Sequence, residues 1–425
     1  MNMVIGLSLI ILFTFGVPIA ISIILASIIG IEFFTRLPLL LVPQQMFIGI
    51  DKFPLMAIPF FILAGNLMAA GGISQRLVDL AKSIVGRVQG GLAMSCVLTC
   101  MMFAAVSGSS VATTFAIGAI LIPAMVKHGY PKPLAASIQA SSAELGVLIP
   151  PSIPLILYGV STDTSIGQLF LAGIGPGILI GSALILFLYL FCKVRGYGKD
   201  DYKDSTGFMI SAKRAWVAML MPVVVIGGIY GGIFTPTEAS AVAVFFALIV
   251  GGFYYRELKV DDLWPIMRQS VVSTAAVMLI IAAASLFSFL LSRTGLPAQI
   301  ANLVTNTIND PLMFLLVVNA LLLVVGMFIE TSAAILVLAP ILTPIAIQFG
   351  IHPVHFGLVM VVNLALGMIT PPLGVNLFAA CAVAKISIDQ MLPWLLRFVL
   401  VVLACLMAIT YMPWISMGLV TAFYG

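Results

Sequence analysis

Small hydroxylic residues gather at two points in an otherwise apolar sequence. The first run is Ser107-Gly108-Ser109-Ser110, and the second is Glu330-Thr331-Ser332. Each run lies between two short apolar segments, an arrangement typical of the tip of a helical hairpin, and its hydroxyl groups offer oxygen ligands. A catalytic serine is disfavoured because no histidine lies in a matching apolar segment to activate it. The chain is therefore not expected to be an enzyme.

Two pairs of consecutive prolines interrupt long apolar segments. Pro150-Pro151 falls within residues 134–160, and Pro371-Pro372 falls within residues 354–381. Each pair removes two backbone donors and forces the preceding residue out of the helix, so both helices should be broken at these points. Carbonyl groups freed there, together with the hydroxyl groups, would form a neutral oxygen cage suited to an alkali cation, whereas helix N-termini favour an anionic substrate.

The composition requires that most of the surface faces lipid. Of the 425 residues, 62% are apolar and 8% are charged, against about 45–50% and about 25% in soluble domains. Continuous apolar runs long enough to cross a bilayer predict an all-α polytopic membrane protein. The first run, residues 4–34, carries Gly16-Val17-Pro18 in its middle and can cross once or turn back there. The net charge of +4 comes without a clustered basic face, which argues against nucleic-acid binding.

The sequence contains an internal repeat. Residues 145–151 resemble residues 366–372, and the same offset of 221 places Ser110 on Thr331. The repeat predicts a chain of five parts, namely N-terminal scaffold segments (1–53), a first repeat (54–192), a hydrophilic connection (193–214), linking scaffold helices (215–274) and a second repeat (275–425).

The two repeats are expected to have opposite orientations. The connection 72–90 contains Arg76, Lys82 and Arg87, whereas its counterpart 295–311 contains neither lysine nor arginine. Because basic loops stay in the cytoplasm, we expect 72–90 and 193–214 on the cytoplasmic side and 295–311 on the other side. Inverted repeats with discontinuous helices are typical of secondary transporters.

Charged residues within apolar segments are functional candidates. Glu144 precedes the first proline pair and can act in the site or simply pair with a neighbour. Glu330 lies in a predicted tip, and Glu238 follows Thr235-Pro236-Thr237, as an acid at a helix start does. The three histidines fall in predicted loops and form no metal-binding set: His128, His352 and His355.

At these motifs the sequence resembles the large membrane subunit of tripartite ATP-independent periplasmic (TRAP) transporters. The resemblance is carried by Ser107–Ser110, Gly146–Pro154, Thr235–Glu238 and Gly367–Asn376. It implies a sodium-coupled importer of organic acids, such as C4-dicarboxylates or sialic acid, in a bacterial inner membrane. It also implies an elevator-type transporter, in which a mobile domain carries the site past a fixed scaffold.

The resemblance also implies two sodium sites. One is assigned to Ser107, Ser110, Gly146 and Pro150, and the other to Gly326, Met368 and Thr370. The sites would be chemically unequal, because Ile149 in the first repeat stands where the second has Thr370. Substrate-binding candidates are Ser109, Thr331, Ser332, Asn363, Asn376 and Asp163. The asparagines, like Asn66, can equally bridge helices, and Asp163 can cap a helix.

The implied partners are a small four-helix membrane subunit of the Q type and a periplasmic substrate-binding protein of the P type. A stand-alone sodium/anion symporter with similar inverted repeats is the alternative, followed by an ion channel. A channel would need a continuous pore rather than a closed site that opens to two sides.

Overall fold

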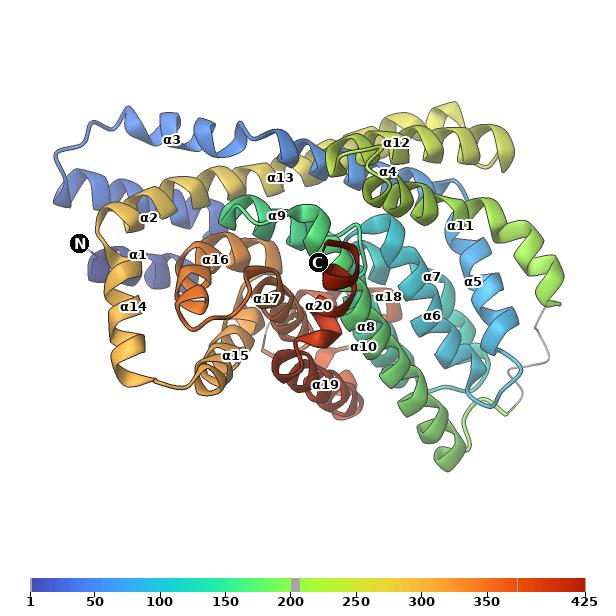
Figure 1. Cartoon of the computed structure of the whole chain (residues 1–425). Helices are drawn as coiled ribbons and strands as arrows, with labels where there is room; N and C mark the ends of the chain where they lie inside the picture. Colours follow the sequence, from blue (N-terminus) through green and yellow to red (C-terminus); the bar gives the residue numbers. More distant parts are fainter. Residues whose placement is uncertain (1, 200–206, 373, 425) are drawn as a thin grey trace.

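The computed structural model describes residues 2–199, 207–372 and 374–424, and these residues form helices and no strand (Figure 1). Within them, nine helical segments are long and apolar enough to cross a membrane. The predicted all-α polytopic fold is therefore confirmed. Residues 200–206 of the predicted connection and residue 373 of the second break lie outside the described residues.

The N-terminal segment folds as two helices rather than one. Helix α1 (Asn2–Thr14) ends before Gly16, whose φ of 73° favours glycine, and Pro18 precedes α2 (Ile19–Phe34). The two helices pack on each other, and α2 also packs on the long helix α13 (Val260–Arg293). The chain thus turns back at Gly16-Val17-Pro18. Helix α3 (Leu41–Ile50) then runs along α13.

The remaining helices come in two matching series. The first is η1 (Phe53–Met56), α4 (Ala57–Ala70), α5 (Ile73–Val85), α6 (Gly91–Ser107), α7 (Ser110–Lys127), α8 (Lys132–Ala143), η2 (Glu144–Val147), α9 (Ile153–Thr162) and α10 (Ile166–Arg195). After α11 (Phe208–Tyr230), α12 (Pro236–Ile249) and η4 (Val250–Tyr254), α13 leads into α14 (Leu296–Thr307), α15 (Pro311–Phe328), α16 (Thr331–Gln348), α17 (Pro353–Met368), α18 (Val375–Ala384), α19 (Ile388–Tyr411) and α20 (Trp414–Tyr424). Helices α7 and α16 begin and end 221 residues apart, which matches the offset of the sequence repeat.

The predicted connections 72–90 and 295–311 are mostly helical, which corrects their interpretation as loops. Helix α5 buries an apolar stripe that includes Leu77 and Val78. Its Arg76 pairs with Glu257 at 2.7 Å and lies 3.7 Å over the ring of Tyr255. Arg76, one of the basic residues from which a cytoplasmic loop was predicted, thus holds an amphipathic helix against the segment before α13.

Of the three histidines predicted in loops, two lie just outside helix ends as expected, whereas His355 lies within a helix and corrects the prediction. His128 follows α7, and His352 caps the start of α17. His355 is buried in the first turns of α17, where its ring bonds the Ser416 hydroxyl at 2.7 Å. The acid predicted at a helix start is confirmed, since Glu238 forms a capping box with Thr235.

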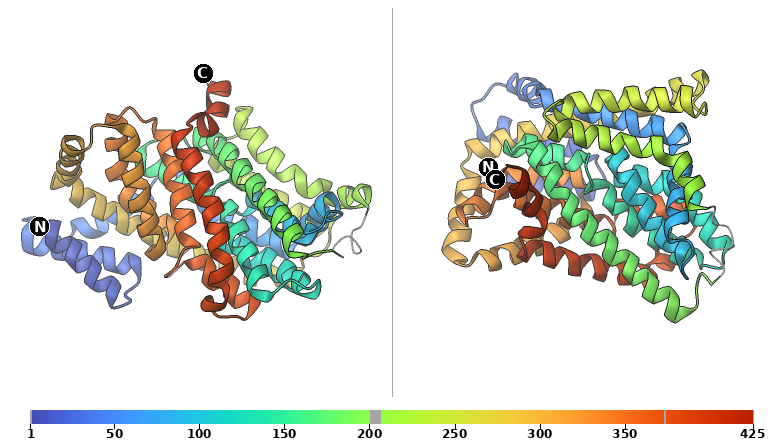
Figure 2. Two further views of the ribbon diagram at one scale, coloured as in Figure 1. Left: turned by 90° about the horizontal axis from the view of Figure 1, so that it is seen from below. Right: turned by 45° about the vertical axis from the view of Figure 1, so that its right-hand side comes forward.

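The buried centre consists of the matching helices α8 and α17. Every residue of α17 from Val354 to Met368 is buried, as is every residue of α8 from Leu134 to Ala143. Around this centre the two series interlock: α9 packs on α16, and α18 packs on α7 (Figures 1 and 2). The short helix that follows each proline pair is therefore held by the hairpin of the other series.

Candidate functional site

The first tip, Ser107–Ser110, joins α6 to α7 and faces the first break. Gly108 adopts a φ of 61°, and the Ser109 hydroxyl caps α7 by accepting from Ala112 N at 3.4 Å. The Gly108 carbonyl accepts from Ile153 N at 3.3 Å. Pro150-Pro151, the proline pair of this break, precedes that residue. The tip is thus tied to the residue that restarts the chain after the break.

Neutral oxygens gather where the first tip meets the first break. The Ser107 hydroxyl lies 3.0 Å from Thr113 Oγ1, which donates to Ser109 O at 2.8 Å. A Cβ atom at Gly146 would lie 2.8 Å from both Ser109 O and Thr113 Oγ1. Only glycine lets the break approach these oxygens so closely, and a set of hydroxyl and carbonyl oxygens suits a sodium ion.

The second tip, Glu330–Ser332, has a different chemistry. The Glu330 carboxylate caps α16, accepting from Ser332 N at 2.9 Å, Ala333 N at 3.2 Å and the Ser332 hydroxyl at 2.8 Å. In the second break, a Cβ atom at Gly367 would lie 2.5 Å from the backbone of Gly326. The Thr370 hydroxyl donates to Leu366 O at 2.7 Å and keeps its lone pairs free for a cation.

Met368 lies between the two tips. Its sulfur accepts from the Thr331 hydroxyl of the second tip and from the Ser110 hydroxyl of the first, the latter at 3.9 Å. The candidate oxygens of the two repeats are therefore neighbours rather than two remote sites. Each tip also faces the break of its own repeat, as the sequence predicted.

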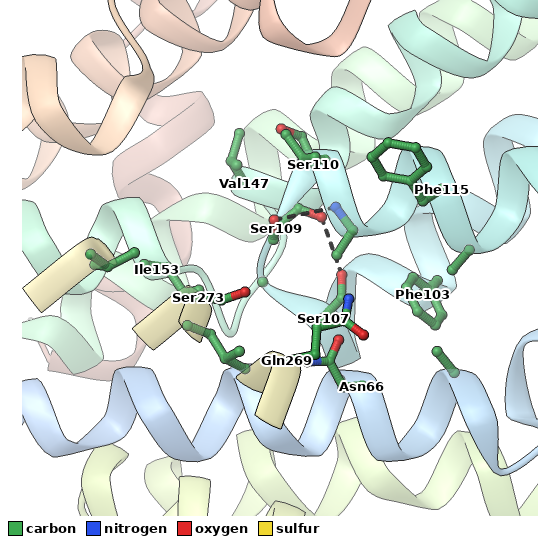
Figure 3. A pocket seen from close by; sticks show the side chains of 18 of the residues that line it. Asn66, Phe103, Ser107, Ser109, Ser110, Phe115, Val147, Ile153, Gln269 and Ser273 are labelled. Carbon is green, nitrogen blue, oxygen red and sulfur yellow. Dashed lines mark hydrogen bonds between the residues drawn. The ribbon is translucent and has the colours of Figure 1, made fainter. Parts of the chain in front are cut away.

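A cavity of about 730 Å³ opens beside the first tip; we call it the tip cavity (Figure 3). Ser107–Ser110 form one side, and Asn66 of α4 with Gln269 and Ser273 of α13 form the opposite side. Phe103 and Phe115 contribute an apolar wall, and Glu330, Ser332 and Met368 reach it from the second repeat. The tip cavity can hold a small organic molecule in contact with both repeats.

Two buried polar joints bind the repeats together. At the first joint, Asn376 of α18 donates to the Glu144 carboxylate and accepts from the Thr114 hydroxyl of α7 at 3.3 Å. At the second joint, the Tyr158 hydroxyl of α9 lies 3.1 Å from Thr343 of α16 and donates to Pro353 O at 2.8 Å. One joint uses a carboxylate, and the other uses neutral groups only.

The structure brings some predicted site residues together and keeps others apart. Those that line the tip cavity are Ser107, Ser109, Ser110, Ser332 and Met368. Gly146 and Pro150 lie in the first break, and Gly326 and Thr370 lie at the second. Thr331 is buried against Met368.

Four predicted substrate ligands lie outside the lining of the tip cavity: Thr331, described above, and Asn363, Asn376 and Asp163. The amide of Asn363 bonds Asn319 at 2.8 Å, and the amide of Asn376 is engaged by Glu144. Asp163 ends α9 with a φ of 53°, as a residue that terminates a helix does. Interhelical bonding and helix termination explain why these polar residues occur in apolar segments.

Gln269 and Ser273 are the polar residues of the tip-cavity lining that the sequence did not single out. They lie four residues apart on α13, so they share one face of that helix. The sequence does contain a signal for this face of the cavity, namely two neutral polar residues at helical spacing inside an apolar segment. Both residues fall in the predicted linking scaffold helices (215–274), outside either predicted repeat, whereas α13 runs across that boundary from Val260 to Arg293.

The chain was compared with known proteins. The family model "Tripartite ATP-independent periplasmic transporter, DctM component" matches residues 7–415. The isethionate TRAP transporter permease protein DctMQ of Oleidesulfovibrio alaskensis is 46% identical over 404 residues, which cover 95% of this chain and 64% of that protein. The C4-dicarboxylate TRAP transporter large permease protein DctM of Pseudomonas aeruginosa is 43% identical over 88% of each chain.

A more distant permease and a solved structure also match. The sialic acid TRAP transporter large permease protein SiaM of Vibrio cholerae is 36% identical over 96% of each chain. The crystal structure of the Alcanivorax borkumensis YdaH transporter superposes with a TM-score of 0.66, covering 89% of this chain and 88% of that one at 17% identity. That structure shares the fold.

Proposed function

The chain belongs to the DctM component family of tripartite ATP-independent periplasmic transporters, and we propose that it imports an organic acid together with sodium ions. The observation that carries the proposal is the pairing of each tip with a broken helix, which gathers neutral oxygens inside a membrane-embedded core. Irregular backbone survives at membrane depth only where it is buried in protein or lines a cavity.

Sodium is the coupling ion that these oxygens suit. We assign one ion to Ser107, Ser110, Gly146 and Pro150, and a second to Gly326, Met368 and Thr370. Sodium prefers several oxygen ligands, and neutral ones avoid the cost of an uncompensated carboxylate in a low dielectric. The close approach of Gly146 to Ser109 O, and of Gly367 to Gly326, supports both assignments.

The substrate would bind in the tip cavity, between the sodium sites and α13. Ser109 and Ser332 offer hydroxyl groups there, and the N-terminus of α7 points amide groups toward an anion. Relatives named for isethionate, C4-dicarboxylates and sialic acid support an organic acid.

We propose an elevator mechanism for the movement. Helices α6–α9 and α15–α18 are tied to each other by the two polar joints and by the crossed packing of α9 on α16 and α18 on α7. They would move as one body against α4 and α13. The tip cavity lies at the boundary between these parts, so sliding would expose it first to one side of the membrane and then to the other.

The family name and the large-permease relatives support two partners in a bacterial inner membrane: a small membrane subunit beside the scaffold helices and a periplasmic binding protein that delivers the acid. Proteoliposomes containing all three should accumulate the acid only under an inward sodium gradient, and those containing this chain alone should be silent. Robust uptake by the chain alone would favour a stand-alone symporter, and single-channel currents would favour a channel.

A further inference from the structure

The tip cavity has two walls that differ in chemistry. One is the first tip, and the other consists of Asn66, Gln269 and Ser273, which we call the α4–α13 wall (Figure 3). The walls approach closely, because a Cβ atom at Gly65 would lie 3.2 Å from Ser107 Cα. A small molecule in the cavity can therefore touch both walls at once.

The orientation of Asn66 is fixed by its neighbours. The Ser270 hydroxyl uses its proton to bond Ile266 O at 2.8 Å, so it must accept from the Asn66 amide nitrogen, which lies 2.8 Å away. The Asn66 carbonyl oxygen is thereby left for the cavity. An acceptor at this place repels a carboxylate and attracts a hydroxyl or amide hydrogen.

The rest of the α4–α13 wall is neutral and unengaged. Among the hydrogen bonds of the described residues, none involves the side chain of Gln269 or Ser273. Both side chains can donate and accept. Lying one helical turn apart, they can bond one hydroxyl group from two directions.

The tip cavity offers no cation for a second anionic group. Its lining contains neither lysine, arginine nor histidine, and its one charged residue, Glu330, already accepts three bonds from the start of α16. The nearest arginine on α13, Arg268, lines an adjoining hollow of about 380 Å³ beside Trp264. A carboxylate against the α4–α13 wall would lose water without gaining a charged partner.

We propose that the α4–α13 wall selects small organic monoanions that carry a neutral hydroxyl group. The anionic group lies at the first tip, and the hydroxyl donates to Asn66 Oδ1 while it bonds Gln269 or Ser273. This inference rests on the proposed function and narrows its substrate class.

The test uses the purified full-length chain in sodium buffer and matched probe anions. One pair is 2-hydroxyethanesulfonate (isethionate) and ethanesulfonate, and another is 3-hydroxypropionate and propionate; the members of each pair differ by one hydroxyl group. Succinate serves as a probe with two carboxylates. Apparent affinity is read from the rise in unfolding temperature as each anion is added. We expect each hydroxylated anion to bind roughly tenfold more tightly than its partner, the scale of one or two lost hydrogen bonds, and succinate to bind weakly.

Single substitutions distinguish recognition of the hydroxyl group from a general disturbance of side-chain packing in the cavity. Ser273→Ala and Gln269→Leu should each reduce the preference for the hydroxyl and leave the affinity for ethanesulfonate unchanged, whereas the control Arg268→Gln should keep the preference. If succinate bound more tightly than every other probe, and Arg268→Gln abolished that binding, the inference would be overturned and the proposed function would stand. Equal losses for all probes in the two wall variants would also overturn it. If no organic acid bound the chain in sodium and none were taken up by the assembled transporter, the proposed function would fall as well.

Discussion

The first tip and the second tip begin helices of equal length, 221 residues apart, yet they present different groups. The first tip exposes serine hydroxyls to the tip cavity, whereas the second uses its carboxylate to cap α16. The breaks differ in the same way, because Ile149 occupies the position that Thr370 has in the second repeat. The two tips hold matching places in the repeats while their side chains differ, which indicates unequal duties for the two tips.

The polar joints extend this contrast. The joint of α18 with α7 contains Glu144, whose Oε2 has no hydrogen-bond partner among the described residues. The joint of α9 with α16 contains only hydroxyl and carbonyl groups. We therefore expect the loss of a polar group to reduce the stability of the fold by different amounts at the two joints, although each joint connects a broken helix to the hairpin of the other repeat.

The largest effects are expected from a methyl group at the glycines of the breaks. Gly367→Ala places Cβ 2.5 Å from the Gly326 backbone, and Gly146→Ala places it 2.8 Å from Ser109 O and the movable Thr113 hydroxyl. Backbone must shift in both cases, and by more at the shorter distance, so Gly367→Ala should abolish uptake and cost about 1–3 kcal/mol of stability. Gly146→Ala should be somewhat milder. Uptake and thermal unfolding measure both.

A matched control for these glycines is Gly227→Ala in α11, where a Cβ atom meets nothing within 4 Å. It should leave uptake and unfolding temperature near those of the unmodified chain. Normal sodium-driven uptake by Gly367→Ala would mean that the close approach of break and tip is not needed.

An intermediate effect is expected at the joints. Glu144→Ala leaves the Asn376 amide buried without its acceptor, which costs about 1–3 kcal/mol. Tyr158→Phe removes one neutral hydroxyl and should cost about 1 kcal/mol. Thermal unfolding of the purified chain compares the two, with Glu144→Gln as the control that keeps an acceptor for Asn376. Equal losses in Glu144→Ala and Tyr158→Phe would remove the distinction between the joints.

The smallest effect is expected from making the breaks more alike. Ile149→Thr adds to the first break the hydroxyl that Thr370 supplies in the second. One added neutral ligand on the scale of about 1 kcal/mol should lower the half-saturating sodium concentration by no more than about fivefold. Sodium titrations of uptake measure it. A rise in that concentration would show that Ile149 is needed for packing against Gly177.

Local rules made the tips and breaks predictable. Proline pairs, glycines and short hydroxylic runs determine the conformation of the backbone next to them. The sequence alone could therefore identify Pro150-Pro151 as a helix break and Ser107–Ser110 as a hairpin tip. The repeat then assigned each tip to its own break. The family followed from the same motifs.

What the sequence did not disclose depends on contacts between distant residues. Asn376 and Glu144 are separated by 232 positions, and no spacing rule joins them. Helix α5 lies in a segment that was interpreted as a cytoplasmic loop from its lysine and arginine content, whereas Arg76 is held by Glu257 and Tyr255. Gln269 and Ser273 line the tip cavity only because α13 packs opposite the first tip, and no local sequence rule predicts that packing.

The most direct test of two unequal sodium sites is uptake against sodium concentration at fixed membrane potential, in the complete transporter carrying Ser110→Ala, Thr370→Ala or both. Each change removes one side-chain oxygen. If that loss costs about 1–3 kcal/mol, the half-saturating sodium concentration should rise roughly 5–150-fold. Sigmoidicity should disappear in either single variant, to different extents in the two, while protein level and partner assembly stay unchanged. Unchanged sodium curves in both variants, or equal uptake driven by protons without sodium, would contradict the account.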